Sequence, residues 1–498
     1  MNGKMHSETG TFSSDGMRAE ILNPFVHKLE LENTYEKIRT AIFTVILLPF
    51  RVVVILYLIV TAWFLACIGL YGLSEADLRK EPMKGWRSKL RFSILSLMRL
   101  VVVVAGFHRV RVIGRHHVPA SPRDAPVVVM APHSSFFDAI AIVCLGAPSV
   151  VAKADTARIP LIGQLINYTQ PVYVWRDDPN SRQNTIKEII ERATSKEDWP
   201  QILIFPEGTC TNRSCLITFK PGGFYPGVPV QPVTIRYPNA RDTVTWTWEG
   251  PGALKLLWLT LTQVHSSCEI EFLPVYYPSE EERRDPKLYA RNVRDVMAKA
   301  LGVPVLDYTY DDCRMIARAK QLGIPSAPAI REVSELRAQL GLERSNLEMH
   351  LVAQGLAGKS RWLTRDEFAQ RLGVPPNVHL QRLYDIFQQS SNGLVYFPDY
   401  LLAAAFLSLQ HAPATQLLAK AFKLYDSSGT GRVSMANFEE LASRCLGLPQ
   451  EEAHHVFRQC DLDDKRYVTY DEFIDFAEKK AEFNFLFASD SHHKPKTQ

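Results

Sequence analysis

The sequence predicts an α/β protein with a mainly parallel β-sheet, preceded by a membrane segment and followed by an all-α domain. Apolar runs alternate with helical or loop stretches between residues 108 and 320, which is typical of parallel strands covered on both faces. An uncharged run covers residues 52–73, and the strand-like runs stop beyond about residue 320. We therefore expect several domains in this chain of 498 residues.

The N-terminal residues are polar and lack apolar periodicity, so we expect the first twenty to be disordered. A stretch with Pro325 and Pro328 marks a boundary before the helical segments. The expected organisation is a polar N-terminus at 1–40, a membrane-associated region at 41–107, a sheet domain at 108–320, a helical domain at 321–485 and a tail at 486–498.

The membrane segment is the uncharged run of 22 residues from Val52 to Leu73. As a helix it would extend about 33 Å, enough to cross a bilayer. Residues 41–50 are also apolar, and Pro49 and Arg51 separate the two runs. A broken or re-entrant hairpin is therefore the alternative to the single span that we favour. A second run, residues 92–107, carries Arg99, and we expect an interfacial or core helix there.

The charges around the span predict its orientation. More lysines and arginines follow it than precede it, which favours a cytosolic location for the domains that follow. The chain ends with Lys494 and Lys496 close to its terminus, and this ending resembles the dilysine retrieval signal of endoplasmic-reticulum membrane proteins. We expect the endoplasmic-reticulum membrane as the location, with the Golgi as the alternative.

Composition excludes some classes of function. A net charge of +4 without a basic block does not indicate a nucleic-acid partner. The eight cysteines are scattered, without the paired spacing of zinc sites, and are too sparse for a disulfide scaffold. We expect a reducing compartment. The oligomeric state stays open.

Eight segments of the sheet domain have the composition of strands. They cover residues 109–113, 126–131, 149–153, 171–175, 201–205, 228–235, 244–248 and 269–276. Chemically active side chains follow two of them, at the sheet edge where α/β proteins bind ligands.

The first of these groups contains His133 and Asp138, which follow the expected strand 126–131. An imidazole with a pKa of about 6.5 can accept a proton from an alcohol near neutral pH, and a carboxylate on its other nitrogen selects the tautomer. We predict His133 as a general base and Asp138 as the group that orients it.

The second group is the block from Phe205 to Cys210, which follows the expected strand 201–205. Together, the His-x4-Asp and Phe-Pro-Glu-Gly-Thr patterns resemble the glycerolipid acyltransferase family. That family has a basic residue after a strand between them, here Arg176, and a proline-containing strand after them, here with Pro232. The four elements occur in the family's order, and the resemblance covers roughly residues 100–300.

The resemblance implies acyl transfer without a covalent acyl-enzyme. A base would deprotonate a glycerol hydroxyl, which would attack the thioester of acyl-CoA. The implied substrates are a lysophospholipid and acyl-CoA as co-substrate, at a lipid bilayer, with no required cofactor. The implied substrate-binding residues are Arg176, Glu207, Gly208, Thr209, Cys210 and Pro232.

Cys210 bears on the choice of acceptor. Many family members that form phosphatidic acid have a basic residue there, and its loss favours a zwitterionic head group. The Glu-Gly-Thr-Cys form and the C-terminal region resemble the lysophosphatidylcholine acyltransferases, some of which also use acetyl-CoA to make platelet-activating factor. We expect lysophosphatidylcholine as acceptor and leave acetyl transfer open.

The C-terminal domain contains two degenerate EF-hand loops that begin at Asp426 and Asp461. The first has Asn437 in place of the bidentate glutamate. The second loop keeps Glu472. However, Lys465 stands at a position that normally supplies a ligand, and Arg466 stands where the sharp turn favours glycine. Calcium should bind weakly, through Asp426, Ser428, Thr430, Arg432, Asn437, Asp461, Asp463, Tyr467 and Glu472. A third, poorer unit covers residues 388–400, and Val433 should pair with Val468.

Two other functions are kept as alternatives. One is a calcium-responsive membrane adaptor whose acyltransferase fold is inactive. The other is an acyl-CoA thioesterase with Cys210 as nucleophile, although no second histidine lies in a neighbouring motif to activate the thiol.

Overall fold

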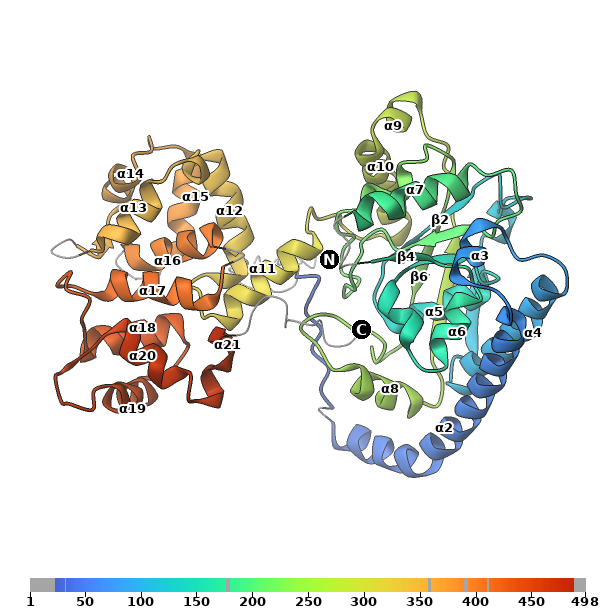
Figure 1. Ribbon diagram of the computed structural model, residues 1–498, viewed down its shortest axis with the longest axis horizontal. Helices are drawn as coiled ribbons and strands as arrows, with labels where there is room; N and C mark the ends of the chain where they lie inside the picture. The colour runs from blue at the N-terminus through green and yellow to red at the C-terminus, as the bar shows by residue number, and fades with distance from the viewer. Residues whose placement is uncertain are drawn as a thin grey trace, which may run out of the picture. The chain divides into compact units, whose positions relative to one another are not determined.

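The computed structural model describes residues 23–31, 33–175, 180–356, 360–388, 393–409 and 412–487. It contains two compact units, which divide between Tyr310 and Asp311. Figure 1 shows the N-terminal unit built around a sheet and the C-terminal unit built from helices. The dilysine-like ending and the first twenty residues lie outside the described residues.

A seven-stranded sheet forms the centre of the N-terminal unit, with the strand order β1-β7-β6-β2-β5-β3-β4. Neighbouring strands are parallel except for β6 and β7, which confirms the predicted mainly parallel sheet. The strands are β1 (Arg109–Ile113), β2 (Val127–Ala131), β3 (Ser149–Lys153), β4 (Val172–Val174), β5 (Ile202–Ile204), β6 (Val230–Arg236) and β7 (Ser267–Phe272).

Helices cover both faces of the sheet because the central strands are apolar on both sides. Val127 and Val129 of β2 pack in one core cluster with side chains of α7 and α10, whereas Val128 and Met130 pack in another with side chains of α5 and α8. The helices of this layer structure are α5 (Ala139–Cys144), α6 (Ile162–Asn167), α7 (Ser181–Ala193), α8 (Ala253–Leu261), α9 (Glu280–Arg284) and α10 (Pro286–Leu301).

One expected strand is wrong. Residues 244–247 are buried, but the segment 244–248 has no partner strand. The backbone N–H groups of Val244 and Thr245 donate to Asp242, and that of Trp246 donates to the Ser134 carbonyl. The alternation of apolar residues reflects burial. The backbone N–H groups, however, donate to a side chain and to a loop carbonyl instead of to a neighbouring strand.

The membrane region folds into a pair of helices. Helix α2 (Thr34–Leu70) begins well before the predicted span, and α4 (Trp86–Val104) packs along it after the short α3 (Glu75–Lys80). By length and composition, α2 could cross a membrane. It contains Pro49 and continues through Arg51, so the predicted alternative of an interruption there is not found. Figure 1 shows that α2 bends, as a helix with an internal proline does.

The C-terminal unit is helical, as predicted. Its helices are α11 (Tyr310–Gln321), α12 (Ile330–Gln339), α13 (Leu347–Gln354), α14 (Arg365–Leu372), α15 (Val378–Phe387), α16 (Phe397–Ser408), α17 (Ala414–Tyr425), α18 (Met435–Cys445), α19 (Gln450–Cys460), α20 (Tyr470–Ala477) and α21 (Asn484–Phe487).

Two short antiparallel ribbons join the loops of the C-terminal unit. In the first, β10 (Val433–Ser434) pairs with β11 (Tyr467–Val468), and Val433 lies opposite Val468 as predicted. In the second, β8 (Trp362–Leu363) pairs with β9 (Val395–Tyr396). The unit predicted at 388–400 therefore has a partner at 347–372, which the sequence did not reveal because that segment lacks EF-hand ligand residues.

Candidate active site

His133 and Asp138 lie at the end of β2 and contact each other directly. Nδ1 of His133 lies 2.8 Å from Oδ2 of Asp138, which also accepts hydrogen bonds from the backbone N–H groups of Ser134 (2.8 Å) and Ser135 (3.1 Å). The hydroxyl of Tyr237 donates to the other carboxylate oxygen over 2.7 Å. These hydrogen bonds fix the position of Asp138, which favours the imidazole tautomer whose Nε2 carries no hydrogen and can accept a proton.

The His133 ring packs against a neighbouring aromatic side chain and remains partly exposed. It stacks on Phe205, with 4.2 Å between ring centroids, and 24% of its side chain is exposed. Burial by itself lowers the pKa of His133, but the adjacent Cys210 sulfur and the Asp138 carboxylate together raise it well above its usual range. An accessible imidazole of raised basicity is suited to remove a proton from an alcohol.

Glu207 holds the His133 segment in place. Its Oε2 accepts the backbone N–H of His133 over 2.6 Å, and Oε1 accepts that of Ile217 over 3.3 Å. The backbone N–H of Thr211 donates in turn to the His133 carbonyl over 2.7 Å. Burial raises the pKa of Glu207 to about 7, although the two backbone donors act in the opposite direction. Both oxygens already bind backbone, so the predicted contact of Glu207 with substrate stays a prediction.

Gly208 allows a lysine to approach this loop. Its φ is +66°, and a Cβ atom there would lie 2.8 Å from Cε and 2.9 Å from Nζ of Lys220. A side chain at position 208 would thus be strained and would collide with the lysine. Sequence reasoning took Cys210 to mean that no fixed cation lies beside the acceptor. The structure places the ammonium group of Lys220 beside Gly208, twelve residues further along the chain.

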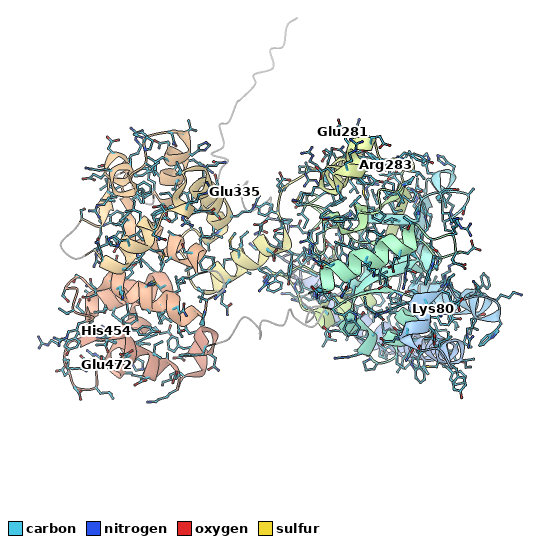
Figure 2. All side chains as sticks on the ribbon, turned by 45° about the horizontal axis from the view of Figure 1, so that its top comes forward. Lys80, Glu281, Arg283, Glu335, His454 and Glu472 are labelled. Atoms are coloured by element: carbon cyan, nitrogen blue, oxygen red, sulfur yellow. The ribbon has the colours of Figure 1, made fainter. Side chains whose placement is uncertain are left out.

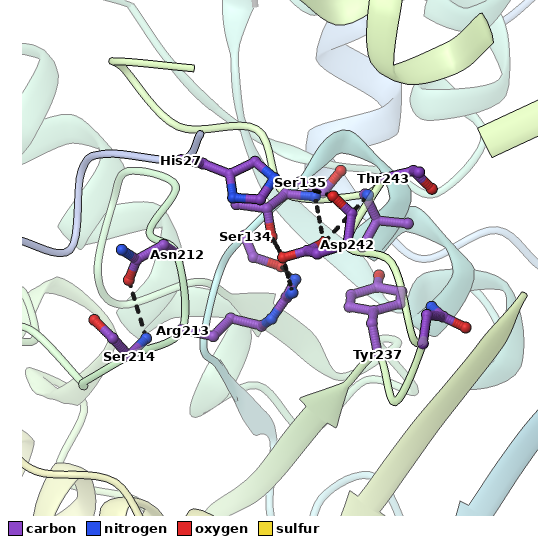
Figure 3. A network of polar contacts seen from close by, with 12 residues as sticks. His27, Ser134, Ser135, Asn212, Arg213, Ser214, Tyr237, Asp242 and Thr243 are labelled. Carbon is purple, nitrogen blue, oxygen red and sulfur yellow. Dashed lines mark hydrogen bonds and ion pairs between the residues drawn. The ribbon is translucent and has the colours of Figure 1, made fainter. Parts of the chain in front are cut away.

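A second polar network supports the segment from the opposite side. Figure 3 shows Arg213 extending towards Ser134 and Asp242. Its guanidinium donates to the Ser134 hydroxyl over 3.1 Å, forms an ion pair with Asp242 at 2.5 Å, and lies over the Tyr237 ring. Sequence reasoning missed Arg213, Tyr237 and Asp242. No local pattern relates them to His133, because tertiary folding brings them together.

The structure brings some predicted site residues together and separates others. Thr209 and Cys210 are buried in the loop that contacts His133. Pro232 instead lies inside β6, opposite Val129 of β2, which is about 13 Å along the strand from the His133 position at about 3.3 Å per residue. That placement does not favour its predicted contact with substrate. Arg176 lies outside the described residues.

In the first EF-hand loop, the carboxylate of Asp426 binds backbone N–H groups of the same loop. The Asp426 carboxylate accepts the N–H groups of Ser428, Gly429 and Gly431, and Asn437 donates to a serine hydroxyl over 3.0 Å. Among the described residues, no group of three or more His, Cys, Asp or Glu side chains could hold a metal ion.

The second loop contains an internal cation. The ammonium group of Lys465 forms an ion pair with Glu472 and lies 3.8 Å from Asp463. The backbone N–H groups of Lys465 and Arg466 donate to Asp461, with Arg466 at φ +64°. Figure 2 shows Glu472 on the C-terminal unit. Lys465 therefore neutralises the carboxylates that a calcium ion would bind.

Comparison with known proteins finds matches to both units of the chain. Residues 109–236 match the Acyltransferase family, and residues 415–478 match the EF-hand domain pair. The lysophosphatidylcholine acyltransferase of Drosophila melanogaster is 44% identical, over 99% of this chain and 92% of the relative. The human lysophosphatidylcholine acyltransferases 1 and 2 are 43% and 40% identical, each over 94% of this chain and over 88% and 85% of their own lengths.

Proposed function

Since the chain belongs to the lysophosphatidylcholine acyltransferase family, we propose that it transfers an acyl group from acyl-CoA to the free hydroxyl of lysophosphatidylcholine. The observation that carries this function is the contact of His133 with Asp138 over 2.8 Å, at the end of β2 and beside the Glu207–Cys210 loop. A base of this kind contributes about 10²–10⁴-fold to a proton-transfer step.

The reaction needs one nucleophilic displacement. Nε2 of His133 accepts the proton of the lysophospholipid hydroxyl while the oxygen attacks the thioester carbonyl carbon. The C–S bond breaks, and CoA leaves as a thiolate, which recovers the proton from His133. Asp138 carries no proton in this sequence, and it stabilises the imidazolium that forms transiently. Glu207 positions the segment through two backbone hydrogen bonds.

The two alternative functions lack comparable support. A thioesterase would release free fatty acid without an acceptor. A calcium-responsive adaptor would need a functional EF-hand loop, whereas the second loop carries its own lysine. The relatives are named as acyltransferases.

The testing experiment uses the purified full chain with a panel of lysophospholipids and acyl-CoAs, including acetyl-CoA, with and without chelator. We expect release of CoA that depends on lysophosphatidylcholine, together with formation of phosphatidylcholine. Release of free fatty acid without an acceptor would instead indicate a thioesterase, and lipid binding without turnover would indicate the adaptor.

The membrane is the expected place of reaction, because α2 is long and apolar enough to enter it. The proposed location is the endoplasmic-reticulum membrane, with the catalytic unit on its cytosolic side. It rests on the charges that flank the span and on the dilysine-like ending. Fluorescence microscopy of the tagged full chain, with Lys494 and Lys496 both changed to Ser as the comparison, tests this location.

The pH dependence of turnover should report the His133–Asp138 pair. Only neutral His133 can accept a proton, so kcat/KM should rise as pH increases through a pKa above 6.5. Asp138→Asn removes the negative charge that favours the imidazolium, so this limb should move to lower pH while kcat falls. Asp155→Asn, an exposed substitution in the same unit, should leave the profile unchanged. If the rise of kcat/KM with pH occurs at the same pH in Asp138→Asn as in the wild type, a group other than the His133–Asp138 pair controls it.

Lys220 should contribute to acceptor binding through its charge. We expect Lys220→Gln to raise the KM for lysophosphatidylcholine about fivefold, the effect of roughly 1 kcal/mol for one cation near a lipid phosphate, with kcat nearly unchanged. Lys299→Gln removes an exposed charge from α10 and should have no effect. An equal KM in both variants would place the acceptor phosphate elsewhere.

We propose that the enzyme needs no calcium. Turnover of the wild type should be unchanged by a chelator, because Lys465 occupies the second loop. Lys465→Asp combined with Arg466→Gly supplies a ligand and the favoured glycine, so isothermal titration should detect calcium in this variant. Adding Glu472→Gln should abolish that binding. Strong binding by the wild-type chain would contradict the role given to Lys465.

A further inference from the structure

A groove of about 740 Å³ opens between α4, β1 and the end of α5. Helix α4 packs against α5. Most of its lining is apolar, with side chains that include Val102, Val110, Val112 and Leu145. Neither His133 nor any residue of the 205–210 loop lines it. The groove is therefore separate from the site where the thioester must react.

Two arginines reach the groove from different elements. Arg99 comes from the middle of α4, and Arg115 from the short 3-10 helix that follows β1. Neither side chain makes a hydrogen bond or an ion pair with any residue that the structure describes. Both guanidinium groups act electrostatically on the Cys144 thiol, opposing the burial that raises its pKa. Arg99, Arg115 and Cys144 all line the groove.

This combination points to a particular class of ligand. Two guanidinium groups that line one groove attract an anion, and phosphate is an anion whose geometry a guanidinium group matches. The valine-lined remainder suits a hydrocarbon chain. Leu100 and Val103 are 47% and 46% exposed on the same helix, so the groove adjoins an apolar surface that lipid chains can contact.

We propose that this groove binds an anionic phospholipid of the surrounding bilayer, with its phosphate between Arg99 and Arg115 and one acyl chain along the valines. The phospholipid is neither the acceptor nor the acyl donor. The inference does not depend on acyl transfer, because the arginines and the groove exist whatever the reaction. A diacyl phosphatidic acid is a suitable probe, since its small head group exposes the phosphate directly.

The test is thermal unfolding of the full chain in neutral detergent, titrated with short-chain diacyl phosphatidic acid. Short-chain phosphatidylcholine and inorganic phosphate are the comparison ligands. We expect phosphatidic acid alone to raise Tm, with an apparent affinity about fivefold weaker in Arg99→Gln or Arg115→Gln and about 25-fold weaker in the double variant. The control, Arg109→Gln with Arg283→Gln, removes two charges outside the groove lining and should behave as the wild type. Figure 2 shows Arg283 on α9.

Modification of Cys144 gives a measurement that requires no change in the arginines. Its half-buried thiol lines the groove, so phosphatidic acid should slow alkylation of Cys144, measured by peptide mass spectrometry, but not that of Cys67. Equal Tm shifts in wild type and double variant, or an unprotected Cys144, would overturn the proposal. So would equal stabilisation by inorganic phosphate, or a double variant that loses acyl-CoA affinity while keeping its phosphatidic-acid response.

Discussion

His133→Ala should lower kcat about a thousandfold, because the variant has no group that can accept the hydroxyl proton. General-base assistance accounts for about 10²–10⁴-fold in enzymes of this kind. The remaining rate would come from binding both substrates in proximity. The measurement is CoA release by the purified chain at saturating lysophosphatidylcholine and acyl-CoA.

The controls separate chemistry from folding. His265→Ala changes an exposed histidine away from the site and should retain full activity. The affinity of His133→Ala for acyl-CoA should stay near the wild-type value, and its Tm should change little because the imidazole is partly exposed. Wild-type turnover by the variant would exclude His133 as the base.

Arg51→Met is expected to have the largest effect on stability. The Arg51 guanidinium donates to the carbonyl oxygens of Leu261 (2.7 Å), Gln263 (2.6 Å) and Val264 (3.0 Å), at the end of α8. Methionine fills similar space but leaves these acceptors without donors. At about 1–3 kcal/mol for each buried unsatisfied group, the two buried carbonyls should cost roughly 2–6 kcal/mol.

The measurement is thermal unfolding of the detergent-solubilised chain, where each kcal/mol corresponds to about 2–4 °C in Tm for a unit of this size. Arg51→Lys should be intermediate, since one ammonium group cannot reach all three carbonyls. Arg109→Met, which removes an exposed arginine from β1, should leave Tm unchanged. An unchanged Tm in Arg51→Met would mean that water replaces the lost donors.

Patterns of neighbouring residues in the sequence predicted the secondary-structure elements that depend on neighbouring residues alone. The strands β1–β7 were found because each is a short run of apolar residues or of apolar residues that alternate with polar ones, and such a pattern depends only on neighbouring positions. The segment at 244–248 has the same composition yet forms no strand, because its N–H groups have closer acceptors in Asp242 and Ser134. Apolar periodicity shows which side chains are buried. It does not show which groups accept hydrogen bonds from the backbone N–H groups.

Arg51 illustrates the same limit in the membrane region. In the sequence it is only a charge that interrupts an apolar run, and it raised a broken helix as the alternative to a single span. In the structure it helps to attach α2 to the end of α8, through carbonyls more than two hundred positions away. Lys220 beside Gly208 and Lys465 beside Glu472 are likewise cations whose partners were identified only from the fold.

The sequence by itself determined the α/β class, the apolar N-terminal helix, the EF-hand-like ribbon and the His133–Asp138 pair, since each depends on spacing along the chain. Only the tertiary structure decided what surrounds that pair: Tyr237 on the carboxylate, Glu207 on the backbone, and Arg213 against Ser134. The reason is physical. A hydrogen bond requires two atoms within about 3 Å, and residues separated by about a hundred positions reach that distance only through the packing of the whole sheet.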